Sequence, residues 1–313
     1  MSLPNLILGV DGGGTKTIAW LAGGPHGELL GRGSAGPSNQ RAVGPRFAMS
    51  HLDEAIQQAF SDAGIERTTV AAACFGLAGA DRESDRAVVL QWASEARVAR
   101  SVRIVNDAAP LLHVSDGDGT GIALIAGTGS LAWGCHADGR ISRSGGWGYL
   151  LGDEGSAYSL GLAALQAVTR HADGRGASTQ LTNAILSHLS LKQPSDIVAA
   201  VYGADVPRAV IAGLAPVVFL QAELSDDVAC EIVRFQATEL AALVSSVARR
   251  LNFSQGFSLS MTGSVLLHQQ AYRNEVRRSL ELQGQMVTRC VLVEHAVEGS
   301  VKIARSMASA MTE

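Results

Sequence analysis

Val10-Asp11-Gly12-Gly13-Gly14-Thr15-Lys16-Thr17 joins two apolar runs, residues 6–10 before it and residues 18–21 after it. This order predicts a strand, a glycine-rich turn and a second strand. Consecutive glycines let the backbone approach an anion closely and direct several N–H groups into one space. Asp11 suits a phosphate-bound Mg²⁺ ion, because that ion prefers carboxylate and water ligands. Taken alone, the stretch is equally well explained as a β-hairpin with a glycine-rich turn.

The same pattern returns with an offset of 113 residues. An apolar run over 122–126 leads into Gly127-Thr128-Gly129-Ser130-Leu131-Ala132-Trp133, which matches Gly14-Thr15-Lys16-Thr17-Ile18-Ala19-Trp20 at the Gly, Thr, Ala and Trp positions. Each copy continues into a polar turn and a third strand, over 29–33 in the first copy and near 140–142 in the second. Matching context on both sides favours a duplication over chance. We therefore expect two similar lobes, with phosphates held between their glycine turns.

Asp107 follows a predicted strand of the first lobe. A helix over about 46–63, a buried strand over 70–77, a helix over about 83–96 and a strand over 102–105 precede it. This alternation implies a mixed sheet covered by helices, and open α/β sheets bind ligands at the carboxyl ends of their strands. Asp107 is therefore a candidate ligand contact. Its alternative role is the N-cap of a short helix over 108–114, and both roles are compatible because a cap leaves one carboxylate oxygen free.

The second half of the chain combines a glycine-rich loop with a largely helical region. Glycines surround Trp147, Asp153 and Glu154, which suits a shaped binding loop better than a core element. Glu154 is also explained as a first-turn acid of the helix that follows. The other predicted elements are helices over about 156–169, 179–189, 206–224 (with a kink or break at Pro216) and 227–250, a strand over 257–261 leading into Thr262-Gly263-Ser264, a strand over 290–293 and a final helix over 301–311.

Composition narrows the function classes. The chain has 313 residues, of which 47% are hydrophobic and 17% charged, as expected of a soluble globular protein with two domains. A net charge of −4 argues against nucleic acid as a partner. The sequence shows neither a secretory signal nor an apolar run of membrane length, so we expect a cytoplasmic protein. The cysteines and histidines lack metal-binding spacing, so no zinc or iron–sulfur site is predicted.

Two common nucleotide-binding motifs do not fit the first glycine turn. From Gly9 the spacing of a Walker A loop reaches Gly14, but Thr15 stands where that motif requires lysine. A dinucleotide-binding GxGxxG turn opens a helix, whereas a strand is predicted here. The sequence is therefore neither a P-loop nor a Rossmann protein.

Five segments, in order along the chain, resemble the N-acetylglucosamine kinase family. That family is part of the BadF/BadG/BcrA/BcrD ATPase group of the actin-like, sugar kinase and heat-shock ATPase superfamily. The resemblance extends from Val10 to about Ala304 and is most specific over 146–156. The segments are Asp11-Gly12-Gly13-Gly14-Thr15-Lys16-Thr17, Asn106-Asp107-Ala108, Ala126-Gly127-Thr128-Gly129-Ser130, Gly145-Gly146-Trp147-Gly148 with Gly152-Asp153-Glu154-Gly155-Ser156, and Thr262-Gly263-Ser264.

The resemblance implies an α/β fold of two ribonuclease H-like (actin-like ATPase) lobes. Each lobe would contain a mixed sheet of the five-stranded type with helices, and ATP would bind in the cleft between the lobes. The N-terminal lobe would comprise residues 1–115 together with a C-terminal helix over 299–313, and the C-terminal lobe would comprise 116–298 with helical insertions. The implied partners are a sugar and a nucleotide, with neither nucleic acid nor membrane, and a homodimer is expected.

By the same resemblance, the chain would phosphorylate the 6-hydroxyl of N-acetylglucosamine with ATP, with Asp107 as the general base. Asp11 would hold Mg²⁺, through water. The implied phosphate contacts are Gly12, Gly13, Gly14, Thr15, Gly127 and Thr128; Gly263 and Ser264 would border the adenosine; and Asn39, Asp107, Gly146, Trp147, Gly148 and Asp153 would contact the sugar. The residue types suit this chemistry independently, because phosphoryl transfer needs positioning, charge neutralisation and a carboxylate that accepts the hydroxyl proton.

Three other functions are compatible with parts of the pattern. A kinase for glucosamine or another amino sugar is the nearest, since 78–80 and 298–300 have similar forms in such enzymes, although the loop around Trp147 favours the N-acetylated sugar. An ATPase that activates a 2-hydroxyacyl-CoA dehydratase would need clustered cysteines, which are not evident. A sugar-responsive repressor would need a DNA-binding helix-turn-helix, and we expect none because the first predicted strand starts so early in the sequence.

Overall fold

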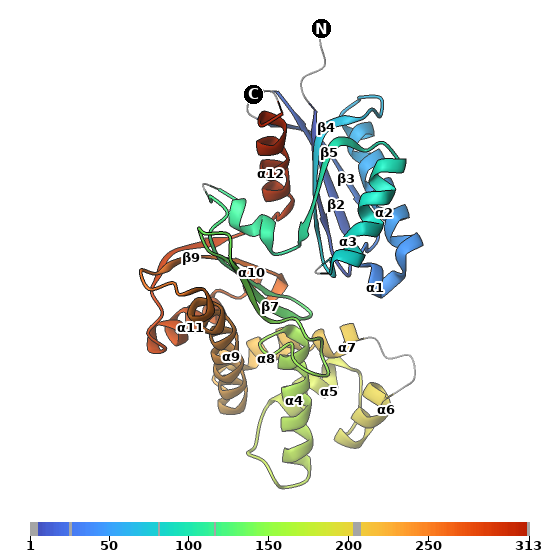
Figure 1. Ribbon diagram of the computed structural model, residues 1–313. Helices are drawn as coiled ribbons and strands as arrows, with labels where there is room; N and C mark the ends of the chain where they lie inside the picture. Colours follow the sequence, from blue (N-terminus) through green and yellow to red (C-terminus); the bar gives the residue numbers. More distant parts are fainter. Residues whose placement is uncertain (1–5, 25–26, 81, 116, 203–207, 312–313) are drawn as a thin grey trace. The chain divides into compact units, whose positions relative to one another are not determined.

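The computed structural model describes residues 6–24, 27–80, 82–115, 117–202 and 208–311. The chain divides into two compact units. Unit 1 comprises Met1–Gly119 and His295–Glu313, and unit 2 comprises Thr120–Glu294. Figure 1 labels most of the helices and many of the strands of the two units, which are considered one at a time below.

Unit 1 is built on a five-stranded mixed sheet in the order β3-β2-β1-β4-β5. The strands are β1 (Ile7–Gly12), β2 (Thr17–Gly23), β3 (Glu28–Ala35), β4 (Val70–Leu77) and β5 (Ala99–Asn106). The first three strands run antiparallel as a meander, whereas β4 and β5 lie parallel to β1. The predicted strand, glycine turn and strand are confirmed, since Gly12 pairs with Thr17 across the turn.

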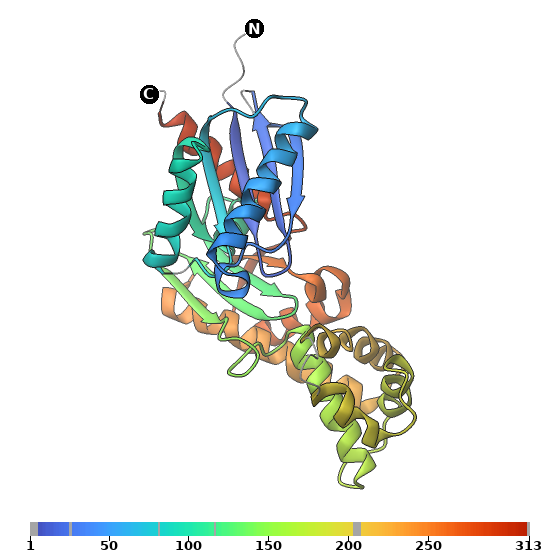
Figure 2. The same ribbon diagram turned by 90° about the vertical axis from the view of Figure 1, so that its right-hand side faces the viewer.

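Helices cover both faces of this sheet, as Figures 1 and 2 show. On one face lie α2 (Pro45–Asp62) and α3 (Glu83–Glu95), close to their predicted bounds, and on the other lies α12 (Val297–Ser309). The final helix was expected to start at 301, but it begins at Val297. It contains Gly299, because α12 approaches the chain so closely that a Cβ there would lie 1.8 Å from the Pro110 carbonyl oxygen. Ser300 Oγ donates a 3.0 Å hydrogen bond to the Val10 carbonyl.

Unit 2 repeats the same topology in the order β8-β7-β6-β9-β10. Its strands are β6 (Gly121–Ala126), β7 (Ser130–Cys135), β8 (Ile141–Gly145), β9 (Phe257–Thr262) and β10 (Val287–Leu292). Again the first three are antiparallel, and the last two are parallel to the first. The α/β prediction of two mixed five-stranded sheets is therefore confirmed, and the sequence repeat corresponds to a structural repeat.

Most helices of unit 2 lie between β8 and β9 in the chain. They are α4 (Ala157–Ala172), α5 (Leu181–His188), α6 (Ile197–Tyr202), α7 (Arg208–Ala212), α8 (Ala215–Glu223) and α9 (Asp227–Leu251), with α10 (Ser264–His268) and α11 (Gln270–Leu282) following β9. The break expected at Pro216 in the helical segment 206–224 is confirmed, because the segment forms two helices that are separated at residues 213–214; its first two residues lie outside the described ranges. Pro216 stands in the first turn of α8, where its missing N–H costs no hydrogen bond.

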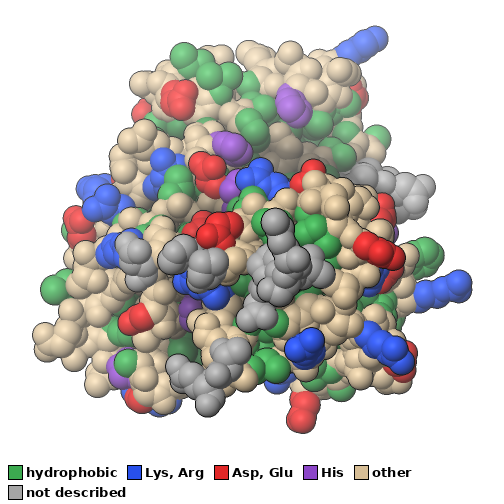
Figure 3. All heavy atoms as spheres, turned by 90° about the horizontal axis from the view of Figure 1, so that it is seen from above, with side chains coloured by type: hydrophobic (Ala, Val, Ile, Leu, Met, Phe, Trp, Pro, Cys, Tyr) green, Lys and Arg blue, Asp and Glu red, His purple; other side chains and the backbone are tan. Residues whose placement is uncertain are grey.

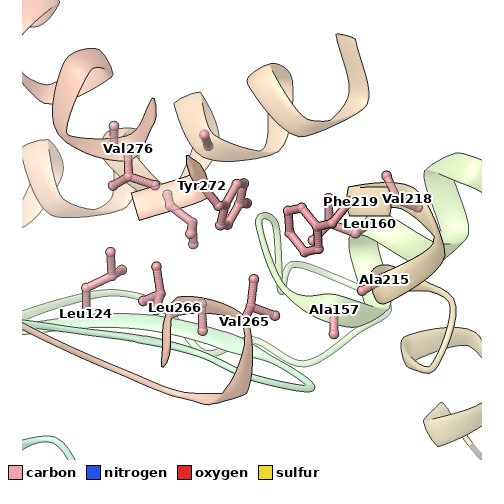
Figure 4. Close-up of a cluster of buried hydrophobic side chains, with 14 of the residues drawn as sticks. Leu124, Ala157, Leu160, Ala215, Val218, Phe219, Val265, Leu266, Tyr272 and Val276 are labelled. Atoms are coloured by element: carbon pink, nitrogen blue, oxygen red, sulfur yellow. The ribbon is translucent and has the colours of Figure 1, made fainter. Parts of the chain in front are cut away.

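Aromatic and aliphatic side chains fill the core of unit 2. Figure 4 shows Phe219 of α8 beside Tyr272 of α11, with ring centroids 5.3 Å apart at an interplanar angle of 66°. Tyr272 is completely buried, yet its hydroxyl donates to the Gly155 carbonyl at 3.0 Å. The core therefore reaches the glycine-rich loop and fixes its end.

In the described ranges, no single helix is both long and apolar enough to cross a bilayer. The segments Arg208–Glu223 and Asp227–Leu251 reach the length and hydropathy of a membrane span only when taken together, and the angle between them is 119°.

On the face shown in Figure 3, acidic and basic side chains are interspersed.

Candidate active site

The first glycine turn packs against protein atoms at Gly12 and Gly13 and is exposed at Gly14. The Gly13 N–H donates to the Lys16 carbonyl at 3.0 Å, and the Gly13 carbonyl accepts from Ser38 N and Asn39 N at 3.1 and 3.2 Å. A Cβ at Gly12 would lie 2.2 Å from Ser38 Oγ, whereas a Cβ at Gly14 would meet nothing within 4 Å. The exposed rim of the turn can therefore receive a ligand without displacing protein atoms.

Asp11 is the ionisable group next to this turn. Burial raises the pKa of Asp11 to about 6, and the Lys16 ammonium lowers it less strongly. In the described ranges, no three His, Cys, Asp or Glu residues come together as a metal site. A single carboxylate fits Mg²⁺ when water and substrate phosphates supply the other ligands, which is the usual arrangement for this ion. Asp11 therefore fits the predicted metal role.

The register of the sheet brings Asp11 and Asp107 to one edge. Gly12 pairs with Leu77 on β4, and Leu77 pairs with Asn106 on β5, immediately before Asp107. Two strand spacings separate Gly12 from Asn106, or about 10 Å. The carboxyl ends of these parallel strands thus bring the first glycine turn and Asp107 to the same edge of the sheet.

The alternative role of Asp107 as a helix cap does not hold. The residues after it form a 3₁₀ helix, Ala109–His113, whose N-cap is Ala108 and which has no side-chain cap. The local turn is instead held by Asn106, whose Oδ1 accepts from Ala108 N at 2.9 Å. The N-cap position therefore belongs to Ala108, and Asp107 is a partly buried residue just before it.

Asn39 joins the same edge through its backbone bond to Gly13. It is the N-cap of the short helix α1 (Gln40–Val43), and its Oδ1 accepts from Arg41 N at 3.0 Å. A Cβ at Gly79 would lie 2.8 Å from that oxygen, so this glycine makes room for the asparagine. Its Nδ2 has no hydrogen-bond partner in the described part of the chain, so it remains a donor for a ligand oxygen.

The second glycine turn is one residue shorter than the first. Four residues, 13–16, separate β1 from β2, but three residues, 127–129, separate β6 from β7. The residue that corresponds to Asp11 is Ile125, since Asp11 pairs with Ile18 and Ile125 pairs with Leu131. Unit 2 thus repeats the turn without a carboxylate at the position of Asp11.

The loop after β8 is fixed at its end by four hydrogen bonds. Ser130 Oγ donates to the Glu154 carbonyl at 2.6 Å, and the Gly155 N–H donates to Gln236 Oε1 at 2.6 Å. Ser156 caps α4, while the Ala157 N–H donates to the Gly127 carbonyl at 2.8 Å. The loop is consequently tied to the second glycine turn.

The beginning of this loop is exposed and contains two glycines with positive φ values. Gly146 and Gly148 have φ values of +70° and +83°, a region that favours glycine. Between them, the side chain of Trp147 is 67% exposed, with the Arg143 guanidinium 5.4 Å from its ring centre. An exposed aromatic ring held by glycines on both sides offers a platform for a ligand.

Asp153 lies in the same loop, between the glycines around Trp147 and the fixed end at Glu154 and Gly155. Its Oδ1 accepts from Ser130 N at 3.2 Å, and its Oδ2 forms a 3.2 Å ion pair with Arg208. Burial raises the pKa of Asp153; the Ser130 hydrogen bond and Arg208 lower it, and Glu154 raises it further. A Cβ at Gly129 would lie 2.8 Å from this carboxylate, so the second glycine turn also makes room for Asp153.

The third glycine turn borders a cavity of about 180 Å³ in unit 2. Gly263 has a φ of +98° and lies against the backbone of Ala126, and the amide of Ser264 would be 3.7 Å from a Cβ at Gly127. The cavity walls include Ala157, Ala215, Phe219 and Val265, four residues labelled in Figure 4, and Ser264, His268 and Gln269 add polar atoms. An apolar slot with polar atoms at one side suits a heterocyclic base.

Several residues that shape these regions had not been predicted. Ser38, Arg208, Gln236 and Tyr272 contact site residues far from them in sequence, so no local spacing identifies them. Ser38 Oγ is buried without a hydrogen-bond partner among the described residues. Within unit 1 the structure brings together Asp11, 12–15, Asn39 and Asp107; within unit 2 it brings together 127–128, Asp153 and 263–264, with 146–148 in the same loop as Asp153.

Comparison with known proteins gives a consistent result. The BadF/BadG/BcrA/BcrD ATPase family model matches residues 8–301. An N-acetylmuramic acid/N-acetylglucosamine kinase of Clostridium acetobutylicum is 32% identical over 301 residues, covering 96% of this chain and 98% of that protein. An N-acetyl-D-glucosamine kinase of Dictyostelium discoideum is 34% identical over 271 residues, covering 82% and 84%.

Solved structures agree on the fold. A protein of Chromobacterium violaceum, itself only provisionally assigned as an N-acetylglucosamine kinase, has a TM-score of 0.75 at 24% identity, with 96% and 99% of the two chains covered. The ROK hexokinase of Thermus thermophilus has a TM-score of 0.58 at 19% identity, covering 98% and 100%. These similarities show the actin-like ATPase fold of the sugar kinases. With the family model matched over nearly its whole length, the chain belongs to the BadF/BadG/BcrA/BcrD ATPase family.

Proposed function

We propose that this protein transfers the γ-phosphoryl group of ATP to the 6-hydroxyl of N-acetylglucosamine. The products are N-acetylglucosamine 6-phosphate and ADP. The observation that carries the proposal is the edge of the first sheet, where the strand register brings together the glycine turn beside Asp11 and the end of β5, which Asp107 follows. Similarity over nearly the full length to a kinase for N-acetylmuramic acid and N-acetylglucosamine supports the choice of acceptor.

Asp107 is proposed as the general base. The sugar oxygen forms a bond to the γ-phosphorus as the bond from that phosphorus to the β,γ-bridging oxygen breaks, and the hydroxyl proton passes to the Asp107 carboxylate. Loss of this proton makes the acceptor oxygen more nucleophilic, a contribution of about 10²–10⁴-fold in rate. Asn39 would orient the sugar through its Nδ2, the donor that its capping bond leaves available.

Asp11 and the first glycine turn are proposed to hold the triphosphate. A Mg²⁺ ion bound there would neutralise phosphate charge during transfer. Asp11 would bind that ion through water, and its burial means that ionisation is favoured only when a cation is close. Gly14 and Thr15 would direct backbone N–H groups at phosphate oxygens, as the open rim at Gly14 permits, and Gly12 and Gly13 would shape the turn that the phosphates contact.

Unit 2 is proposed to supply the remaining contacts. Gly127 and Thr128 would contact phosphate, and the cavity beside Gly263 and Ser264 would receive the adenosine. Gly146, Trp147 and Gly148 would form a platform for the sugar ring, and Asp153 would accept hydrogen bonds from its hydroxyls. The exposure of Trp147 supports this role, because sugar rings stack on exposed aromatic faces.

A phosphorylation screen tests the proposal. Purified protein would be incubated with Mg·ATP and each of N-acetylglucosamine, N-acetylmuramic acid, glucosamine, N-acetylmannosamine and glucose, with ADP release measured and the products identified by ³¹P and ¹³C NMR. We expect turnover with N-acetylglucosamine and a phosphate at carbon 6. No turnover above the sugar-free rate, or a phosphate at carbon 1, would refute the proposal.

The screen also separates two closely related functions. A glucosamine kinase of Vibrio cholerae is 27% identical over 239 residues, so glucosamine is the second candidate acceptor. Faster turnover of glucosamine than of its N-acetylated form would favour that assignment. A cytoplasmic location and a homodimer also belong to the proposal; light scattering tests the latter.

A further inference from the structure

We propose that Arg208 is a positioning residue for the acceptor sugar, holding Asp153 and Tyr149 of the glycine-rich loop in their binding geometry. This inference rests on the proposed function, in which Asp153 binds sugar hydroxyls. No sequence motif marks Arg208, which lies 55 residues after Asp153 in the chain. Its role follows from three contacts with the loop and with α4.

The first contact is the ion pair with Asp153. Arg208 Nη2 lies 3.2 Å from Oδ2, while Ser130 N binds Oδ1 at the same distance. The two donors come from different elements and approach different oxygens, so together they fix the plane of the carboxylate. Each carboxylate oxygen has two lone pairs, and one on each remains for a sugar hydroxyl.

The second and third contacts are with aromatic rings. The Arg208 guanidinium lies 4.4 Å from the ring centre of Tyr149, in the loop, and 5.8 Å from that of Tyr158, on α4. The two rings are themselves 5.3 Å apart at an angle of 68°. A planar guanidinium can stack on a ring and donate hydrogen bonds in its own plane at once, which an ammonium group cannot do. Arg208 therefore links the loop to α4 as well as to Asp153.

The backbone at Asp153 shows why such a support is needed. Asp153 has a φ of +64°, a conformation that is costly for a residue with a side chain. Its side chain is only 6% exposed, and it shares the site with Gly129, whose missing Cβ leaves the space it occupies. A conformation of this kind persists only when its surroundings fix it. The Arg208 side chain is 42% exposed, so it lies at the rim, between this buried carboxylate and solvent.

The charges around Asp153 also support a positioning role for Arg208. Burial raises the pKa of the Asp153 carboxyl, the Ser130 N–H and Arg208 lower it, and the neighbouring Glu154 raises it. In the described part of the chain, Arg208 and Glu154 are the charged groups that act on Asp153. Without Arg208, burial and Glu154 would raise the pKa of this carboxyl further, and a protonated acid has less acceptor capacity for sugar hydroxyls. Arg208 thus fixes the position of Asp153 and lowers the pKa of its carboxyl.

The test compares Arg208→Met and Arg208→Lys with wild type. The methionine keeps the apolar stem without charge, and the lysine keeps the charge without the planar stack. We expect Arg208→Met to raise the KM for N-acetylglucosamine about tenfold or more, with the KM for ATP unchanged and kcat lowered less than the KM is raised. We expect Arg208→Lys to recover part of the loss. Arg175→Met is the matched control, because Arg175 forms an exposed ion pair with Asp173 in the same unit.

A second readout is independent of turnover. The Asp153 carboxyl is titrated by ¹³C NMR, with its signal assigned by comparison with Asp153→Asn. In Arg208→Met the midpoint should move to higher pH, and the acid limb of kcat/KM for the sugar should move in the same direction. An unchanged midpoint overturns the inference, as does an equal loss in the KM values for sugar and ATP, which would indicate a general structural defect. A wild-type protein inactive on every sugar would refute the proposed function, and the titration would still decide whether Arg208 controls Asp153.

Discussion

The two glycine turns occupy the same place in two sheets of the same topology, but their surroundings differ. The turn at 13–16 follows Asp11 and lies at an edge shared with Asp107, whereas the turn at 127–129 follows Ile125 and makes room for Asp153. One copy therefore has two carboxylates at its sheet edge, which the proposed function assigns to the metal and the acceptor, whereas the other copy adjoins the loop that contains Asp153. Duplication preserved the scaffold, while the chemistry depends on single residues at the ends of the strands.

The largest expected effect is at Asp107, which has no counterpart in the second copy. Asp107→Asn should lower kcat by about 10²–10⁴-fold, because the amide cannot accept the hydroxyl proton. Asp53→Asn, which removes a surface ion pair with Arg67 in the same unit, is the control and should leave kcat unchanged. Circular dichroism would verify folding, and kcat would be measured by ADP release. A folded Asp107→Asn variant with near-normal kcat would show that another group accepts the proton.

The next effect concerns the position where the copies differ, Asp11 and Ile125. Asp11→Asn should raise the Mg²⁺ concentration needed for half-maximal turnover and reduce activity at saturating ATP, because the amide binds the metal–water complex more weakly than a carboxylate. Ile125→Val in the second copy should leave the Mg²⁺ dependence unchanged. An unaltered Mg²⁺ dependence in Asp11→Asn would remove the metal role from this residue.

The same substitution should stabilise the ligand-free protein at neutral pH. Burial raises the pKa of Asp11 to about 6, so between about pH 4 and 6 the folded state holds a proton that the unfolded state has lost. The contribution of Asp11 to the free energy of unfolding therefore falls as pH rises through this window and stays low above it. We expect Asp11→Asn to be more stable than wild type by about 2 kcal/mol at pH 7.5, which is the effect of a pKa of about 6 in place of 3.8, discounted for the partial exposure of this residue.

Urea denaturation at pH 7.5 and pH 4 measures this difference. The stabilisation should largely disappear at pH 4, where the carboxyl is protonated in the folded state and about half protonated in the unfolded state. Equal effects at the two pH values would mean that Asp11 acts through packing instead of ionisation. Together with the loss of activity, the expected result would identify Asp11 as a site where stability is sacrificed for metal binding.

The sequence predicts the parts of this comparison that depend on local pattern. Strand periodicity and glycine spacing identify both turns, and the strand before Asp107 places it at a ligand-binding edge. Other features depend on contacts between distant residues. Gly299 lies inside α12 instead of before it, because this helix packs closely against Pro110. Asp153 pairs with Arg208, 55 residues further along the chain, and the nearby Gly155 bonds to Gln236, 81 residues after it. No pattern in a short window encodes such contacts.

The smallest expected effects separate glycines needed for packing from glycines needed for a ligand. In the first turn a Cβ at Gly12 would collide with Ser38 Oγ at 2.2 Å and Leu77 Cδ2 at 2.6 Å, whereas Gly14 has open space around it. In the second turn Gly129 would meet Asp153 at 2.8 Å, whereas Gly127 makes only ordinary contacts from 3.7 Å. Each copy thus has at least one glycine of each kind at or beside its turn.

Alanine substitutions should divide along the same line. Gly12→Ala and Gly129→Ala should lower the free energy of unfolding by about 1–3 kcal/mol through overpacking. Gly14→Ala and Gly127→Ala should change it by less than about 1 kcal/mol and yet raise the KM for ATP roughly tenfold, equivalent to about 1.4 kcal/mol of binding free energy, because a methyl group keeps phosphate away from the backbone N–H groups. Urea denaturation and ATP saturation curves measure the two quantities separately. A normal KM for ATP in both Gly14→Ala and Gly127→Ala would refute this distinction, because the open glycines would then be needed neither for packing nor for phosphate binding.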